Sequence, residues 1–398
     1  MPDIDLVAPS QPSPGQRVAV GPVGTAGESS RRLLRNLERP GLMFANITPN
    51  CFASVMGTGI VANAAATLPV QFPGLRPAAT VVWMMAGLLL VALIAATAIH
   101  WMRFGATARG HHSNPVMAHF YGAPPMALLT VGAGTVLLGK DVIGLDVAVA
   151  VDAVLWTVGT VLGVMSAIAV PYLTFTRHEI GDDSAFGGWL MPIVPPMVSA
   201  ATGALLLPYA PEGQVGLTLM LACYCLFGMS LIASLIVITL IWGRLARHKL
   251  GASGMVPTLW IVLGPLGQSI TAANLLGGNA SLIVPAPWST ALELFGVTFG
   301  VPVLGFASLW AALAIAVTVR TARRQLPFSL TWWSFTFPVG TCVTGVSGLA
   351  VHTGSVALQG LAVVFYLGLV SAWAIVAVRT FHGSIISGSL FAVPPVTS

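Results

Sequence analysis

Long apolar stretches alternate with short polar connections along the chain, and ten of these stretches are long enough to cross a membrane. Crossing about 30 Å of hydrocarbon takes roughly 20 apolar residues in a helix. The pattern therefore predicts an all-α polytopic membrane protein with ten transmembrane helices. The predicted spans are 47–70, 77–104, 119–139, 147–175, 189–210, 215–242, 257–280, 288–319, 332–354 and 355–378.

Composition supports this class and excludes several others. Of 398 residues, 56% are hydrophobic and only 7% are charged, which no ordinary soluble domain matches. All four cysteines lie in apolar spans, so neither a disulfide framework nor a metal site is expected, and no cofactor is predicted. The formal charge of +5 is better explained by membrane topology than by nucleic-acid binding.

The basic residues predict the orientation of the chain in the plasma membrane. All but two of the 17 Lys and Arg residues fall on one side of the predicted spans, and the exceptions are Arg76 and Lys140. The positive-inside rule then places both termini in the cytoplasm. Three regions follow: a disordered basic tail (1–40) without a cleavable signal peptide, a ten-helix transporter domain (41–382) and a short cytoplasmic tail (383–398).

The odd-numbered spans contain a repeated backbone irregularity. Their prolines at 125, 195, 265 and 338 are separated by 70, 70 and 73 residues, and a further step of 70 reaches the glycine-containing segment 54–59 of the first span. The spacing predicts five helical hairpins in parallel orientation around a central pore, unless the irregular positions merely help the helices to pack. The predicted kink residues are Gly57, Gly59, Pro125, Pro195, Pro265 and Pro338.

The polar residues of the odd spans indicate what such a pore would conduct. None of these spans contains Asp, Glu, Lys or Arg. A cation path usually uses carboxylates, whereas free backbone N–H groups at helix breaks favour anions. Small polar residues also let helices pack closely, which is the simpler explanation for any one of them. The predicted pore-lining residues are Asn50, Ser54, Thr58, Thr130, Ser199, Gln268, Asn274 and Thr341.

Few ionisable residues lie within the spans. His119 opens the third span and is the candidate proton relay, because the pKa of an unperturbed histidine lies near neutral pH. Asp152 and Glu293 lie on even spans toward the outside. The sequence contains no catalytic triad, HExxH motif or dinucleotide fingerprint, so it is not expected to be an enzyme.

Four motifs stand out in the predicted spans: Phe52–Ile60, Met191–Pro196, Leu263–Ser269 and Leu326–Pro338. They resemble the tellurite-resistance/dicarboxylate transporter family, which includes fungal malate permeases, sulfite efflux pumps, bacterial tellurite-resistance proteins and plant slow anion channels. The resemblance covers residues 40–382, and the form of the first motif is closer to the permease and sulfite-pump branch than to the plant channels.

This resemblance implies ten helices in quasi-fivefold order, and a homotrimer in which each subunit has its own pore. In channel-type members a phenylalanine on the ninth helix plugs the pore. By motif position that residue is Phe337 here, with Phe335 as the alternate.

The leading hypothesis is a membrane protein that transports small anions, either a C4-dicarboxylate such as malate or an oxyanion such as sulfite or tellurite. The alternative is a passive, gated anion channel plugged by Phe337. A membrane-embedded enzyme and a non-transporting sensor are the remaining classes to be distinguished.

Overall fold

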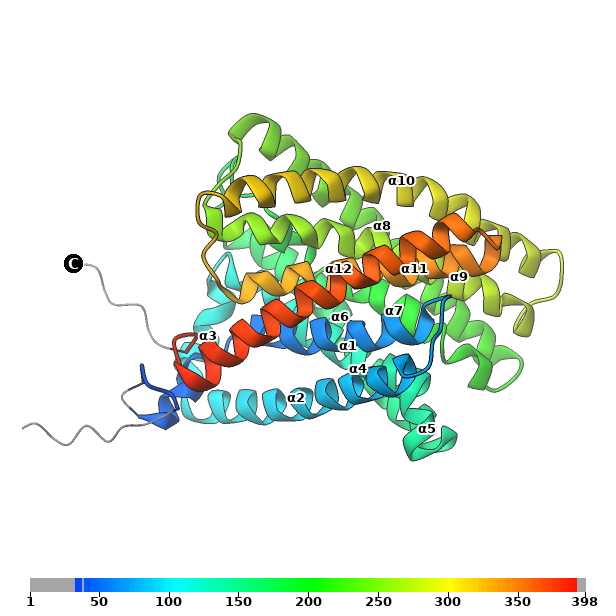
Figure 1. Cartoon of the computed structure of the whole chain (residues 1–398), viewed down its shortest axis with the longest axis horizontal. Coiled ribbons are helices and arrows are strands. Elements are labelled where there is room, and N and C mark those ends of the chain that lie inside the picture. Colours follow the sequence, from blue (N-terminus) through cyan, green and yellow to red (C-terminus); the bar gives the residue numbers. More distant parts are fainter. Residues whose placement is uncertain (1–32, 38, 392–398) are drawn as a thin grey trace, which may run out of the picture. The chain divides into compact units, whose positions relative to one another are not determined.

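The computed structural model describes residues 33–37 and 39–391, and within these ranges every regular element is a helix (Figure 1). The α-helices are α1 (Ala53–Thr67), α2 (Leu75–Arg103), α3 (Gly105–Ser113), α4 (Ala123–Gly134), α5 (Lys140–Ile143), α6 (Leu145–Thr176), α7 (Pro195–Gly203), α8 (Gln214–His248), α9 (Leu263–Asn279), α10 (Trp288–Ala322), α11 (Phe337–Thr353) and α12 (Val356–Phe381). The 3-10 helices are η1 (Pro40–Asn46), η2 (Pro49–Phe52), η3 (Met117–Gly122), η5 (Gly187–Leu190), η6 (Leu207–Tyr209), η7 (Ser253–Val262), η8 (Ala280–Leu282) and η9 (Leu330–Phe335), and η4 (Thr135–Gly139) and η10 (His382–Ile386) are π-helices.

Eight helical segments in the described part of the chain are long and apolar enough to cross a membrane. They coincide with eight of the ten predicted spans. The other two predicted spans are also helical but are not among these eight segments: 47–70 becomes η2 and α1, and 189–210 becomes η5, α7 and η6. The eight segments are Leu75–Arg103, Met117–Ile143, Leu145–Thr176, Gln214–His248, Ser253–Leu282, Trp288–Ala322, Leu330–Thr353 and Val356–Ile386.

Burial separates the spans into an inner and an outer set. In the segments that contain α4, α9 and α11, 72%, 89% and 83% of the apolar stretch is buried. In α2, α6, α8, α10 and α12 the share is between 11% and 33%. A helix that is buried all round packs against protein, whereas one that exposes apolar side chains suits contact with lipid. The outer helices α2, α8, α10 and α12 run in roughly one direction in Figure 1.

The contacts between the five inner helices form a closed ring. Helix α1 contacts α4, α4 contacts α7, α7 contacts α9, α9 contacts α11, and α11 contacts α1. Each of these five helices also contacts the long helix that follows it in sequence, which is α2, α6, α8, α10 or α12. The inner helices therefore have protein on nearly every side.

Each inner α-helix is preceded by a 3-10 helix. Proline lies at the first or second position of α4, α7 and α11, where its missing N–H needs no partner within the helix. Of the predicted kink residues, Pro195 and Pro338 lie at these positions, and Pro125 and Pro265 lie at the third position of α4 and α9. Gly57 and Gly59, in contrast, lie inside the continuous helix α1.

Outer helices donate hydrogen bonds to the backbone of these irregular segments. The indole N–H of Trp156 in α6 donates to the Ser199 carbonyl at 2.8 Å, and that of Trp310 in α10 donates to Leu259 at 2.8 Å. The hydroxyl of Ser230 in α8 donates to the Ile193 carbonyl, just before α7, at 2.6 Å. Ile193 lies just before α7 and Leu259 lies in η7, so these two donors stabilise carbonyls at irregular backbone that water does not reach within a bilayer, whereas Ser199 lies inside α7.

Glycine allows α9 and α11 to approach closely. A Cβ atom on Gly267 would lie 2.5 Å from the backbone nitrogen of Cys342, which is shorter than a van der Waals contact. Likewise, a Cβ on Gly340 would lie 2.4 Å from the Ile60 side chain of α1. The backbones of the inner helices therefore lie near the limit of packing, as small residues permit in membrane proteins.

The predicted N-terminal tail (1–40) falls mostly outside the described residues, and so does the end of the predicted C-terminal tail from residue 392. Where the two tails are described, they pair with each other. The backbone N–H of Leu34 donates to the Ile385 carbonyl, and that of Asn36 donates to Ser387 at 2.8 Å.

Candidate functional site

A central cavity of about 280 Å³ lies among the five inner helices α1, α4, α7, α9 and α11, each of which contributes side chains to its wall. The polar residues of the wall are Asn63, Thr67, Thr130, Thr202, Gln268, Thr271, Asn274, Thr344, Ser347 and His352. No Asp, Glu, Lys or Arg lines the cavity within the described part of the chain. Its wall is thus uncharged apart from any charge on the one histidine.

Several polar groups of this wall hold one another in place. The hydroxyls of Thr271 and Thr344 are 2.7 Å apart, and the side-chain nitrogen of Asn63 donates to the Thr130 carbonyl at 3.0 Å. Gln268 is 4% exposed, and its side chain makes no hydrogen bond to any described residue. An amide carries both donors and an acceptor, so Gln268 is available to bind a ligand in the cavity.

Phe337 is the one described residue that lines both the central cavity and a second, smaller cavity of about 20 Å³. The wall of the second cavity is mainly apolar and includes Met56, Phe120 and Met126. The Phe337 side chain is 2% exposed and stands at the first position of α11, immediately before Pro338. Its ring therefore lies on the boundary between the two cavities.

Phe335 lies elsewhere, although it is only two residues away. It lines a cleft of about 440 Å³ with side chains of α10 and α12. Its ring meets the rings of Trp260 and Trp332 edge-on, at centroid distances of 5.5 Å and 5.7 Å. The two phenylalanines thus face different surroundings.

The remaining predicted lining residues divide into two groups. Thr130, Gln268 and Asn274 line the central cavity, and Asn50, Ser54, Thr58, Ser199 and Thr341 do not. Most of the second group have internal partners: the Ser54 hydroxyl donates to the Cys51 carbonyl at 2.7 Å, and the Thr58 hydroxyl accepts from the indole of Trp373 at 3.1 Å.

Ser199 and Thr341, which were predicted to line the pore, lie one helical turn before Thr202 and Thr344, which do line the cavity. The pairs Thr271 and Asn274, and Thr344 and Ser347, each line the wall at a spacing of three residues. Residues three apart share one face of a helix, so this spacing of polar residues was a signal for the wall. Asn63 and Thr202 complete the set on α1 and α7.

His119 lies outside both cavities. Its Nδ1 is 2.8 Å from the Pro115 carbonyl, and its ring stacks on Trp189 at a centroid distance of 5.9 Å. Asp152 of α6 is fully buried beside Gly132 of α4, and neither carboxyl oxygen has a hydrogen-bond partner among the described residues. Neither group reaches the wall of the central cavity.

The described residues include no cluster of three or more His, Cys, Asp or Glu side chains placed to hold a metal ion. The wall of the central cavity combines amides and hydroxyls with apolar side chains such as Val198 and Leu275. The hydroxyls of Thr130 and Thr202 already donate to backbone carbonyls of their own helices. The amide of Gln268 is therefore the best placed of these groups to donate a hydrogen bond to an anion without adding a charge to the cavity.

Residues 46–381 match the family described as voltage-dependent anion channel. The sulfite efflux pump SSU1 of Arthroderma otae is 27% identical over 367 residues, which are 90% of this chain and 95% of that protein. The SSU1 pump of Trichophyton rubrum is 26% identical over 365 residues, again 90% and 95% of the two chains. An uncharacterized transporter of Methanocaldococcus jannaschii is 28% identical over 299 residues, covering 75% of this chain and 82% of that one.

Proposed function

Because the chain belongs to the family of voltage-dependent anion channels, which is the tellurite-resistance/dicarboxylate transporter family whose motifs it carries, we propose that it transports small oxyanions of the sulfite type through the central cavity. The family consists of transporters and channels rather than enzymes. The two fungal relatives are named as sulfite efflux pumps, which favours sulfite over malate and tellurite as the first substrate to test.

The path we propose runs along the axis of ten transmembrane helices in five hairpins. The divided segments that contain α1 and α7 complete the ten. The closed series of contacts among the five inner helices supports a quasi-fivefold arrangement, and each inner helix pairs with the outer helix that follows it. By family resemblance the protein forms a homotrimer with one path in each subunit.

One observation carries the proposal: a cavity without acidic, lysine or arginine side chains in the described residues, which takes amides, hydroxyls and apolar side chains from all five inner helices, ends at the ring of Phe337. Carboxylates would repel an anion, and none lines this wall in the described residues. Weak binding by uncharged donors suits passage, because an ion must leave as readily as it enters. Phe337 then serves as the gate, and Phe335, facing another cleft, serves as its control.

The test compares anion flux and electrical current in proteoliposomes for the wild type, Phe337→Ala and Phe335→Ala, each with sulfite, malate and chloride. Removing the Phe337 ring joins the two cavities, so we expect sulfite flux to rise about tenfold or more, whereas Phe335→Ala should stay near the wild type. The expected increase reflects loss of a local barrier of about 1.4 kcal/mol or more.

The outcomes of this experiment distinguish the substrate, the role of Phe337, and a channel from a carrier. Wild-type flux of malate without sulfite would replace the substrate, and no flux of any of these anions would overturn the function. Equal effects of both substitutions would remove Phe337 from its role. A large current after Phe337→Ala favours the passive gated channel, whereas slow electroneutral flux in every variant favours a carrier.

A further inference from the structure

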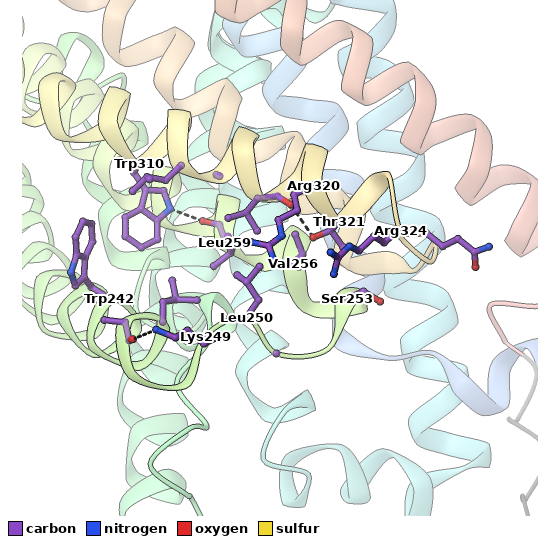
Figure 2. A pocket seen from close by; sticks show the side chains of 17 residues that line it. Trp242, Lys249, Leu250, Ser253, Val256, Leu259, Trp310, Arg320, Thr321 and Arg324 are labelled. Atoms are coloured by element: carbon purple, nitrogen blue, oxygen red, sulfur yellow. Dashed lines mark hydrogen bonds between the residues drawn. The ribbon is translucent and has the colours of Figure 1, made fainter.

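A cleft of about 790 Å³ opens between the ends of α8 and α10, away from the central cavity (Figure 2). Helix α8 ends at His248 and α10 ends at Ala322, and both helices are long and apolar enough to cross a membrane. The 3-10 helix η7 supplies part of the wall through Val256 and Leu259. The cleft therefore lies where two spans leave the bilayer.

The inner part of the cleft is apolar and rigid. Trp310 is 3% exposed, and its indole N–H donates to the Leu259 carbonyl. The ring of Trp242, which is 47% exposed, lies 6.0 Å from the Trp310 ring. Leu313 and Val317 extend this surface along α10. A surface of this kind suits a hydrocarbon chain lying along the helix, with an amphipathic indole at its edge.

Three cations stand around the cleft: Lys249 after α8, Arg320 in the last turn of α10, and Arg324 just beyond it (Figure 2). Both arginines are exposed, and neither makes a side-chain hydrogen bond or an ion pair within the described part of the chain. The Lys249 ammonium donates to the Ala246 carbonyl at 3.0 Å, which leaves further N–H groups for another acceptor.

We propose that this cleft binds an anionic phospholipid, with its phosphate at Arg320 and Arg324 and an acyl chain along Trp310, Leu313 and Val317. The two arginines at the membrane boundary complement a phosphate, and the apolar surface continues from them along α10. Lys249, across the cleft in Figure 2, adds to the positive charge of the opening. A guanidinium also matches the geometry of phosphate oxygens better than an ammonium does.

The test measures how tightly the purified full-length protein holds phosphatidylglycerol, using mixed micelles of phosphatidylglycerol and phosphatidylcholine and native mass spectrometry. We compare the wild type with the double variant Arg320→Gln and Arg324→Gln. A matched control, Arg103→Gln with Arg109→Gln, removes two cations that do not line the cleft. Val317→Trp keeps the charges but fills the apolar part.

We expect the cleft double variant to bind phosphatidylglycerol about 25-fold more weakly, at about fivefold for each cation removed. Val317→Trp should also weaken binding, the control pair should match the wild type, and phosphatidylcholine should bind weakly to all. Wild-type affinity in the double variant would overturn the proposal. So would competition by inorganic phosphate that is as strong as the lipid, which would mean a phosphate site.

The same mass spectra give the size of the oligomer, which tests whether a second copy of the chain, rather than a lipid, covers the cleft. If Val317→Trp dissociates an oligomer and phosphatidylglycerol binding is unaffected, a second copy of the chain covers the cleft and the lipid proposal is wrong. An unchanged oligomer with lost lipid supports it. None of these readouts depends on anion flux, so the lipid site can fail while the proposed transport holds, and the reverse.

Discussion

Gln268 is a residue at which one substitution would change the charge of the proposed path. It belongs to the wall of the central cavity, is almost fully buried and has an amide free of partners among the described residues. Replacing it by glutamate hardly changes the shape of the side chain but adds a carboxylate where an anion would pass. At the low effective dielectric of a buried site, like charges repel by several kcal/mol.

We therefore expect Gln268→Glu to lower sulfite flux in proteoliposomes by about tenfold or more. Ser199→Ala is the matched control, because Ser199 is also fully buried on an inner helix but does not line the cavity. Its flux should equal that of the wild type. If the glutamate variant transports sulfite as well as the wild type does, the path does not pass Gln268.

The sequence located the polar residues of the inner spans but not their direction. A 3-10 helix turns 120° per residue and an α-helix turns 100°. A few residues of 3-10 helix at the start of a segment therefore rotate the direction in which all later side chains of that segment point. Phe335 ends the 3-10 helix η9, and Phe337 begins α11. For this reason motif position left both residues open as the gate, and Ser199 and Thr341 were expected in a wall that they do not reach.

At the scale of elements, outer helices supply side chains that bind backbone carbonyls in the segments before the inner α-helices. The carbonyl of Ile193 binds Ser230 of α8, and that of Leu259 binds Trp310 of α10. These donors lie about 40 to 50 residues away in sequence on helices that otherwise look uniformly apolar. No local pattern identifies such partners, since they are set by tertiary packing.

The close approach of α9 and α11 gives a prediction for stability. In Gly267→Ala the new methyl group would meet the backbone of Thr341 and Cys342, so we expect a loss of about 1–3 kcal/mol in stability, measured by thermal unfolding in detergent. Gly264→Ala is the control on the same helix, since its methyl group would lie 4.0 Å from Pro338, an ordinary contact. It should leave stability unchanged or raise it by up to about 1 kcal/mol. Equal unfolding temperatures for the two variants would contradict the packing.

For the whole molecule, length and hydropathy predicted the all-helical class and the approximate position of eight membrane-length segments in the described part of the chain. They did not reveal where 3-10 and α segments follow one another within the inner spans, because the two helix types have the same composition. The orientation rests on the basic residues, whose asymmetry is strong: only Arg76 and Lys140 fall on the opposite side. Arg76 pairs there with Asp141, an exposed contact that contributes little to stability.

The orientation can be tested with one pair of cysteines on either side of α8. Glu212 and Ala252 are both exposed, in the connections before and after this helix. In a Cys225→Ser background, since the other three cysteines are buried, a membrane-impermeant maleimide should label Glu212→Cys on intact cells. Ala252→Cys should be labelled only after permeabilisation. The reverse result would place both termini outside.

A barrier made by one aromatic ring differs from one made by moving helices in its temperature dependence. Rotation about the torsions of one side chain moves few atoms, whereas collective helix motion moves many and takes microseconds to milliseconds. Because added methyl groups on Gly267 and Gly345 would clash with the facing backbone, the inner helices have little room to slide. Opening at Phe337 would then need a smaller activation enthalpy than a rearrangement of the inner helices, and warming would speed transport less steeply.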